Sequence, residues 1–392
     1  MPHRSNLTLW LIVLGLSLGP AVSNGFARFA YGLVLPAMRD DLGWSYTEAG
    51  WINTANAIGY LLGALLALGA ISRFGPAFLF IGGMALTALS LVLSGLTTDF
   101  WLLSAWRILA GIGGAPVFIA GGVMASALFR DDKAKNALAI AVYFGGGGIG
   151  MIICGGALPY MVDWYGIDVW PLTWVLVGVL SYLCFIPGYW AAAASPGPPP
   201  APRGEGGRLP NRRMFCAEAA YFCFGLGYVI YITFLIAWLH YRGAGTGLIA
   251  WTWAIMGMAV WLSPFVWSRV LAGAEGGRAI ALTSLAVGLG ILIPLIDATI
   301  IGVTASALLV GGSFFMVPTS VTTFSRKNLP QEQWGKAMAL FTVIFSVGQI
   351  IGPTGAGYLA DLTGDNTAGL GAAGCILLLG AVFGAMQRPL AR

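Results

Sequence analysis

Charged residues are scarce in this chain. Only 9% of its 392 residues are Asp, Glu, Lys or Arg, whereas soluble domains contain about 25%. Hydrophobic residues make up 58%. These proportions exclude a soluble globular enzyme with a single membrane anchor, because apolar sequence extends over almost the whole length. The composition predicts an all-α polytopic membrane protein.

Histidine and paired cysteine are nearly absent. The two histidines, His3 and His240, are far apart, and none of the five cysteines forms a C-x-x-C pair. We therefore expect neither a metal site nor a cofactor, and we interpret the cysteines as small apolar side chains in helices. No phosphate-binding loop and no nucleophile–base set can be recognised, so the sequence does not predict an enzyme.

Basic residues exceed acidic ones and give a net charge of +5. They border the apolar segments and are not interleaved with aromatic residues, so a nucleic-acid partner is not predicted. The expected partners are the lipid bilayer and a small-molecule substrate, and we expect a monomer.

The chain does contain a series of long apolar runs, and hydropathy marks twelve spans. The first six are residues 7–38, 47–71, 76–97, 99–129, 136–162 and 168–190. The second six are residues 213–240, 247–272, 278–297, 299–325, 336–361 and 368–387. The first run begins like a signal peptide but continues well past Ala21–Ser23, so we interpret it as a membrane span.

The distribution of Lys and Arg predicts the orientation of these spans. With the N-terminus inside, sixteen of the twenty basic residues lie on the cytoplasmic side, and only Arg39 and Arg242 lie outside. An inverted topology would reverse this bias. We expect a multi-pass membrane protein with both termini in the cytoplasm.

Residues Ala191–Arg213 interrupt the pattern, since ten of these 23 residues are Pro or Gly. We interpret them as a cytoplasmic linker between an N-terminal six-helix bundle, residues 1–190, and a C-terminal one, residues 214–392. The two halves are related in sequence at a constant offset of 200 residues. The matching pairs are Gly25 and Gly225, Tyr31 and Tyr231, Trp51 and Trp251, Gly111 and Gly311, Gly148 and Gly348, and Gly155 and Gly355.

Arg28 is the main candidate for a functional residue. It lies eight to ten residues before the outer end of the first span, which places it roughly 12–15 Å below the boundary of a ~30 Å hydrocarbon layer. A guanidinium at this depth is costly in lipid, so it should face protein, water or a ligand. Asn24, Arg28 and Tyr31 are spaced i, i+4 and i+7 and should share one helical face.

Further candidate residues lie in the second and seventh spans. Asn53, Asn56 and Tyr60 fall on one face of the second span. The seventh span carries aromatic residues at the positions that match the Arg28 face, and these are Phe224, Tyr228 and Tyr231. We predict that these polar and aromatic faces bind substrate. The structural alternatives are that Arg28 caps backbone carbonyls, that the asparagines join helices and that the tyrosines are plain packing.

Four segments resemble motifs of one transporter family. Residues 25–38, GFARFAYGLVLPAM, and 225–235, GLGYVIYITFL, are similar to the YbfB/YjiJ branch of the major facilitator superfamily. Residues 106–113, WRILAGIG, resemble the R-x-x-x-G-x-G motif of the fourth helix, and residues 348–353, GQIIGP, resemble the glycine–proline pattern of the eleventh. The chain thus resembles this superfamily over essentially its whole length.

Two motifs of the superfamily are altered here. Residues 69–77, GAISRFGPA, lack the acid and the arginines of the usual loop between the second and third helices. The glycine-rich residues 145–156 lack the proline of the antiporter signature. Gating details are therefore not carried over, and an antiport mechanism is less well supported.

The resemblance implies a twelve-helix fold of two pseudo-symmetric halves, with the ligand site between them at mid-membrane, and secondary transport by alternating access. It also implies structural or gating roles for Arg107, Gly111, Gly352 and Pro353. Glu218 is the only acid inside a span. We interpret it as an interfacial partner for an arginine or, alternatively, as a group in proton coupling.

We expect the substrate to be a small organic anion, because a guanidinium suits bidentate recognition of a carboxylate and a buried anion needs a fixed counter-charge. One alternative is efflux of amphipathic drug-like compounds. Alternatives of another class are a channel, a lipid scramblase or a non-transporting receptor. Counterflow in liposomes separates them, because only a carrier exchanges labelled for unlabelled substrate with saturation.

Overall fold

The computed structural model describes residues 5–129, 131–195 and 209–390. All regular secondary structure in these residues is helical, and it includes twelve segments that are long and apolar enough to cross a membrane. The twelve predicted spans are confirmed, with ends that differ by a few residues.

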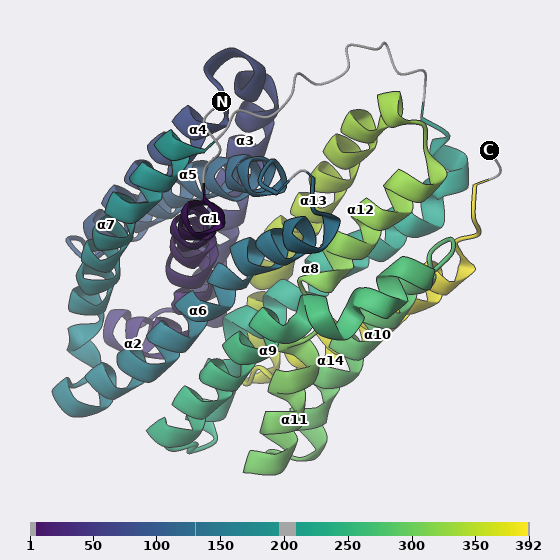
Figure 1. The fold of residues 1–392 in the computed structure, drawn as a ribbon. Helices are drawn as coiled ribbons and strands as arrows, with labels where there is room; N and C mark the ends of the chain where they lie inside the picture. Colours follow the sequence, from purple (N-terminus) through teal and green to yellow (C-terminus); the bar gives the residue numbers. More distant parts are fainter. Residues whose placement is uncertain (1–4, 130, 196–208, 391–392) are drawn as a thin grey trace. The chain divides into compact units, whose positions relative to one another are not determined.

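The N-terminal half contains six of these spans, and Figure 1 shows its helices in purple to blue. The first is built from α1 (Asn6–Pro20), the π-helix η1 (Ala21–Phe29) and α2 (Ala30–Leu42). The next four are α3 (Tyr46–Phe74), α4 (Pro76–Ser94), α5 (Phe100–Ser126) and α6 (Lys133–Tyr165). The sixth consists of the short 3₁₀ turn η2 (Ile167–Val169) and α7 (Trp170–Ala194).

The C-terminal half contains the other six. The first three are α8 (Asn211–Tyr241), α9 (Thr246–Gly273) and α10 (Arg278–Ile296). The tenth span of the chain is divided into α11 (Ile300–Gly311) and α12 (Met316–Asn328). The last two are α13 (Trp334–Thr363), which follows the 3₁₀ turn η3 (Gln331–Gln333), and α14 (Thr367–Met386).

Contacts between residues divide the chain into two compact units. The first unit comprises the described residues of 1–42 and 55–200, and the second comprises those of 43–54 and 201–392. Helix α3 is thus divided between the units after residue 54. Both ends of the expected linker are helical, because α7 continues to Ala194 and α8 begins at Asn211. Residues 196–208 of that linker lie outside the described residues.

The first span is not a uniform α-helix. Residues Ala21–Phe29 are π-helical, and the amide of Ala30 donates to the carbonyl of Gly25, five residues earlier. Pro20 directly precedes this segment, and its missing N–H interrupts the α-helical bonding pattern. π-helical turns occur frequently at functional sites, and this one contains Arg28.

Glycines allow helices within each unit to cross with their backbones in contact. In the first unit, a Cβ placed on Gly146 would overlap the carbonyl oxygen of Ser17 on α1, and one on Gly111 would overlap that of Asn56 on α3. In the second unit, a Cβ on Gly352 would lie 2.6 Å from the carbonyl oxygen of Leu226 on α8. The high glycine content therefore serves close helix packing, as is usual in membrane bundles.

The tenth span is broken between α11 and α12. In the break, the indole Nε1 of Trp267 donates a 2.8 Å hydrogen bond to the carbonyl oxygen of Gly312. Irregular backbone at membrane depth is tolerated where protein or a cavity satisfies its polar groups, and broken helices often carry the binding sites of transporters. The break also holds Phe314, whose ring is described below.

The start of α3 is held on α13 in the second unit. The carboxylate of Asp361 accepts hydrogen bonds from the amides of Tyr46, at 2.7 Å, and Thr47, at 2.9 Å. A Cβ placed on Gly50 would overlap the carbonyl oxygen of Pro353. Residues 46–54 of α3 therefore pack with the second unit, which explains where the contact boundary lies.

Candidate functional site

Arg28 is almost completely buried in η1, with 5% of its surface exposed. Its guanidinium carbon lies 5.0 Å from the centre of the Tyr60 ring on α3, within the range of a cation–π interaction. No hydrogen bond to this guanidinium and no carboxylate paired with it is found in the described part of the chain. An unpaired buried charge is costly, so a negatively charged group beside Arg28 would be strongly favoured.

Arg107 on α5 is the second buried cation of the first unit, with 1% of its surface exposed. Its Nη2 donates a 2.6 Å hydrogen bond to the carbonyl oxygen of Ala27, within η1. Its Nε and Nη1 are buried without a hydrogen-bond partner. Arg107 therefore supports the π-helical segment that carries Arg28, and two of its donor atoms are left unused.

Tyr31 lies beside Arg107. The guanidinium carbon of Arg107 is 5.5 Å from the centre of the Tyr31 ring and 4.8 Å from that of Trp174 on α7. The sequence prediction grouped Tyr31 with Arg28 by α-helical spacing. In η1 the backbone hydrogen bonds run from i to i+5, so the α-helical spacing behind that prediction does not apply within this segment. Asn24 is buried in the same segment, and its Nδ2 donates to Ser23 Oγ at 3.3 Å.

The two asparagines of α3 form helix-to-helix hydrogen bonds. Asn56 Nδ2 donates to the carbonyl oxygen of Arg107 at 3.1 Å and so joins α3 to α5. Asn53 Nδ2 donates to Thr233 Oγ1 on α8, within the second unit. Both bonds join helices, which is the role that the sequence offered as the alternative to substrate binding for these asparagines. Of the three predicted positions in the second span, Tyr60 is the one whose side chain contacts Arg28.

The two tyrosines of α8 lie in different surroundings. The hydroxyl of Tyr231 is fully buried and lies 2.7 Å from Ser306 Oγ on α11. The ring of Tyr228 instead stacks on Phe224, with ring centres 4.7 Å apart and planes inclined by 12°. Gln349 on α13 donates from Nε2 to the Tyr228 hydroxyl. Gln349 was not among the predicted site residues. It could have been found in the same way as Asn53 and Asn56, because it is also an amide side chain within an apolar span.

The remaining predicted residues serve packing or have no partner. Glu218 on α8 is half-buried, and its Oε1 has no hydrogen-bond partner. The expected arginine partner of Glu218 is not found among the described residues. Gly111, Gly352 and Pro353 lie at the helix crossings described above. Within the same residues, no group of three or more His, Cys, Asp or Glu side chains could hold a metal ion.

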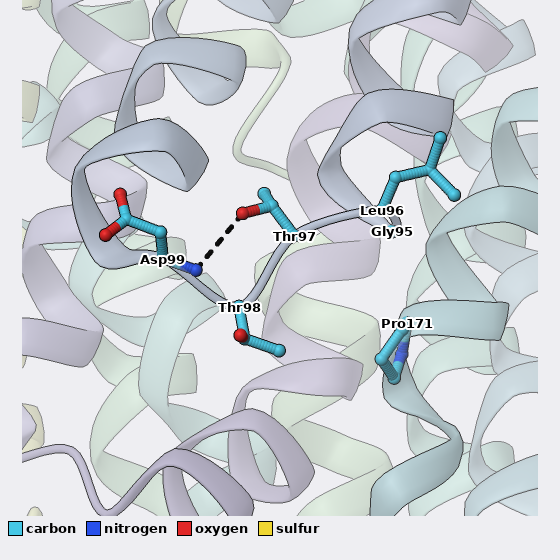
Figure 2. A pocket seen from close by; sticks show the side chains of 6 residues that line it. All are labelled: Gly95, Leu96, Thr97, Thr98, Asp99 and Pro171. Carbon is cyan, nitrogen blue, oxygen red and sulfur yellow. Dashed lines mark hydrogen bonds between the residues drawn. The ribbon is translucent and has the colours of Figure 1, made fainter.

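Two hollows of the structure contain none of the predicted site residues. Figure 2 shows the first, formed by the turn after α4 and by Pro171, where the amide of Asp99 donates to Thr97 Oγ1 at 3.1 Å. The second is lined by Tyr46, Trp238, Tyr241, Arg242, Asp365 and Asn366. The hydrogen bond in the first hollow, between Asp99 and Thr97, is one that an ordinary surface turn makes. The buried arginines therefore remain the more informative feature.

Known proteins resemble this chain along almost its full length. A family profile described as "Uncharacterised MFS-type transporter YbfB" matches residues 20–384. No similar sequence is found among curated proteins.

Solved structures agree with the chain in fold. A mutant of the nucleoside transporter NupG superposes with a TM-score of 0.68 at 15% identity, over 96% of this chain and 98% of that chain. A bacterial homologue of the human lysosomal transporter Spinster, inward-facing and occupied, gives a TM-score of 0.70 at 16% identity, over 98% of this chain and 97% of that chain. At such low identity, these likenesses show the fold alone.

Proposed function

The chain belongs to the YbfB family of major facilitator superfamily transporters, and from this premise we propose that it is a secondary transporter whose substrate is a small organic anion recognised by Arg28. The observation that carries the proposal is that Arg28, a buried residue, has no hydrogen bond and no paired carboxylate among the described residues. The family and the fold support secondary transport, and the chemistry of Arg28 supports the anion.

A carboxylate suits this environment for two reasons. A guanidinium offers five N–H donors in a plane, which match the two oxygens of a carboxylate, and the cation–π contact of Arg28 with Tyr60 uses none of these donors for a hydrogen bond. In addition, Arg107 is close enough to Arg28 for the two charges to repel each other. A substrate anion would offset this repulsion, because no described carboxylate does so.

We further propose the cellular setting and the coupling. The bias of basic residues supports a protein of the bacterial inner membrane, with both termini in the cytoplasm. We propose that it acts as a monomer and that substrate movement is coupled to protons. Glu218 is the candidate for the coupling group, because its carboxylate lies inside a span and has a buried oxygen without a partner.

The test is a panel of carboxylates, sulfonates, neutral compounds and hydrophobic cations, with binding measured on the purified protein. Replacement of Arg28 by Ala should weaken carboxylate binding by the value of a charge-assisted hydrogen bond, about 1.5–3 kcal/mol, or about ten- to hundredfold in Kd. Arg28→Lys should recover part of the loss, since an ammonium retains the charge without the planar donors. Arg39→Ala is the matched control, because Arg39 lies in the same span and pairs with Asp40 at 3.4 Å.

Efflux of amphipathic compounds is the second candidate function, and the stacked aromatic rings around Tyr228 favour it. If a neutral or cationic compound binds best and Arg28→Ala leaves its affinity unchanged, this second function replaces the first. Counterflow in liposomes then tests transport itself, because a carrier exchanges labelled for unlabelled substrate with saturation.

A further inference from the structure

Five aromatic rings in the second unit form a continuous stack, which we call the ring column. Its members are Tyr221, Phe224 and Tyr228 on α8, Phe345 on α13, and Phe314 in the break between α11 and α12. Neighbouring ring centres lie 4.7–6.0 Å apart, and the ring planes are inclined by 10–15°. Residues from three spans therefore present their ring faces in nearly one orientation.

The ring column is not a requirement of the six-helix fold. The positions that match it in the first half, at the offset of 200 residues, are Ala21, Asn24, Arg28, Gly114 and Gly145. None of these residues is aromatic. The first half thus forms its six spans with no ring at any of the five positions, so packing alone does not account for the column.

Two polar atoms beside the ring column have no partner. Gln349 uses Nε2 for its bond to the Tyr228 hydroxyl, and its Oε1 has no hydrogen-bond partner. The hydroxyl of Ser346 is also without one. Both side chains are completely buried. Gln349 lies three residues after Ser346 and four residues after Phe345, so its side chain neighbours both of theirs on the surface of α13.

Unpartnered polar atoms at this burial are costly and require an explanation, of which a missing ligand is one. A bound compound with a polar group at this position would satisfy them. Because an amide can be turned by 180° with little change in packing, the atom of Gln349 that faces such a ligand is either an acceptor or a donor. The matching group is in both cases a neutral polar substituent.

From this geometry we propose that the ring column binds a flat conjugated ring of the transported compound, with Gln349 and Ser346 bonding a polar substituent of that ring. The inference rests on the proposed function and narrows the substrate class to compounds that carry a flat aromatic or heteroaromatic ring. Parallel ring faces select a flat ring, because offset stacking requires two planar surfaces. A saturated ring of the same size is too thick for such a contact and has no π-system.

The column has features that permit a ligand to enter. Phe345 is only half-buried, whereas Phe224, Tyr228 and Phe314 are buried. Phe314 lies in the turn between α11 and α12, outside both helices. A ligand ring would then replace or extend the stack at these two residues.

The experiment compares ligands that differ only in planarity. Benzoate is paired with cyclohexanecarboxylate, and 2-naphthoate with its fully saturated analogue, and binding to the purified full-length protein is measured by calorimetry. We expect the flat member of each pair to bind about three- to tenfold more tightly, the value of an aromatic pair beyond its buried area. Equal affinity within the pairs, weaker binding of the flat member, or no binding of either would overturn the proposal.

Variants locate the preference on the ring column. Phe345→Leu should bring the affinity ratio of benzoate to cyclohexanecarboxylate close to one. The control is Phe383→Leu on α14, which removes a ring from an edge-to-face pair with Phe215 in the same unit and should leave the ratio unchanged. Phe314→Leu serves as the second variant if Phe345→Leu does not fold. An unchanged ratio in the folded column variant would show that the preference arises elsewhere and would refute the assignment.

This proposal and the anion proposal fail separately. If cyclohexanecarboxylate binds as well as benzoate and both lose affinity in Arg28→Ala, the ring column is not the binding surface and the anion proposal stands. If neutral benzamide binds as tightly as benzoate while cyclohexanecarboxamide binds weakly, the ring column stands and the anion proposal fails.

Discussion

The carboxylate of Asp361 offers the clearest quantitative prediction. The first amides of a helix have no partner within the helix itself. In α3, the amides of Tyr46 and Thr47 donate to Asp361, and the amide of Glu48 donates to Ser45 Oγ at 3.1 Å. Asp361 also accepts from Thr47 Oγ1 at 2.5 Å. Its charge lies at the N-terminal end of the α3 dipole, where a negative charge is favourable.

Replacement of Asp361 by Asn should loosen the start of α3 from α13. A hydrogen bond to a charged group contributes about 1 kcal/mol more than a neutral one, and two backbone bonds are affected. Because Asp361 is exposed, solvent screening reduces this sum, and we expect a loss of about 1–2 kcal/mol. A change of that size should speed the exchange of the Tyr46 and Thr47 amides by about five- to thirtyfold.

Hydrogen–deuterium exchange in lipid nanodiscs measures this effect directly. Asp365→Asn is the matched control, because Asp365 accepts at 2.9 Å from the amide of Thr367 at the start of α14. That variant should speed exchange in α14 and leave α3 unchanged. The difference between wild type and Asp361→Asn should also shrink at about 1 M salt, where exposed charges are screened. Unchanged exchange at Tyr46 and Thr47, or an equal effect of both variants on α3, would refute the reasoning.

Two further predictions concern the first unit. Gly111→Ala should destabilise the protein by about 1–3 kcal/mol, because the added Cβ would overlap the backbone of α3. In a thermal melt, its transition temperature should be lower than that of the control Gly69→Ala, whose Cβ meets nothing within 4 Å. A Gly111→Ala protein as stable as Gly69→Ala would contradict this. Arg107→Ala should reduce transport and leave the order of anion affinities unchanged, because Arg107 bonds the backbone of η1. If a well-folded Arg107→Ala protein loses all ligand binding, Arg107 contacts the substrate and this prediction is wrong.

The spans could be predicted from sequence because hydropathy and charge act over whole segments. A helix of about twenty apolar residues is required by the thickness of the bilayer, whatever its neighbours are. The twelve spans and their approximate ends follow from this requirement alone. The 57 glycines of the sequence are likewise typical of closely packed membrane helices.

The local shape of the first span could not be predicted in the same way. Pro20 interrupts the α-helical bonding, but the π-helical turn that follows is also held by tertiary contacts: a Cβ on Gly25 would lie 2.6 Å from Gly150 on α6, and Arg107 bonds the carbonyl of Ala27. Sequence spacing assumes 3.6 residues per turn and has no information on such contacts. The contact of Tyr31 with Arg107, which joins the first span to α5, was for this reason not predicted from the sequence.

The ring column was beyond sequence analysis for a related reason. The aromatic positions of α8 were recognisable, but Phe314 and Phe345 lie in other spans, and only the rotation of each helix determines which rings meet. The sequence repeat nevertheless helps to separate residues that maintain the fold from residues that recognise the substrate. Residues that match between the halves, such as Gly25 and Gly225, maintain the common fold and carry little information on the substrate.

The positions that differ between the halves carry the functional information. Arg28 and Tyr228 occupy the same position of the repeat. One is a buried cation without a carboxylate partner among the described residues, and the other is a member of a ring stack bonded by Gln349. Since the fold tolerates either side chain at this position, neither is explained by the architecture. An anionic group is the chemical feature that Arg28 would recognise in the first unit, and a flat ring is the feature that Tyr228 would recognise in the second.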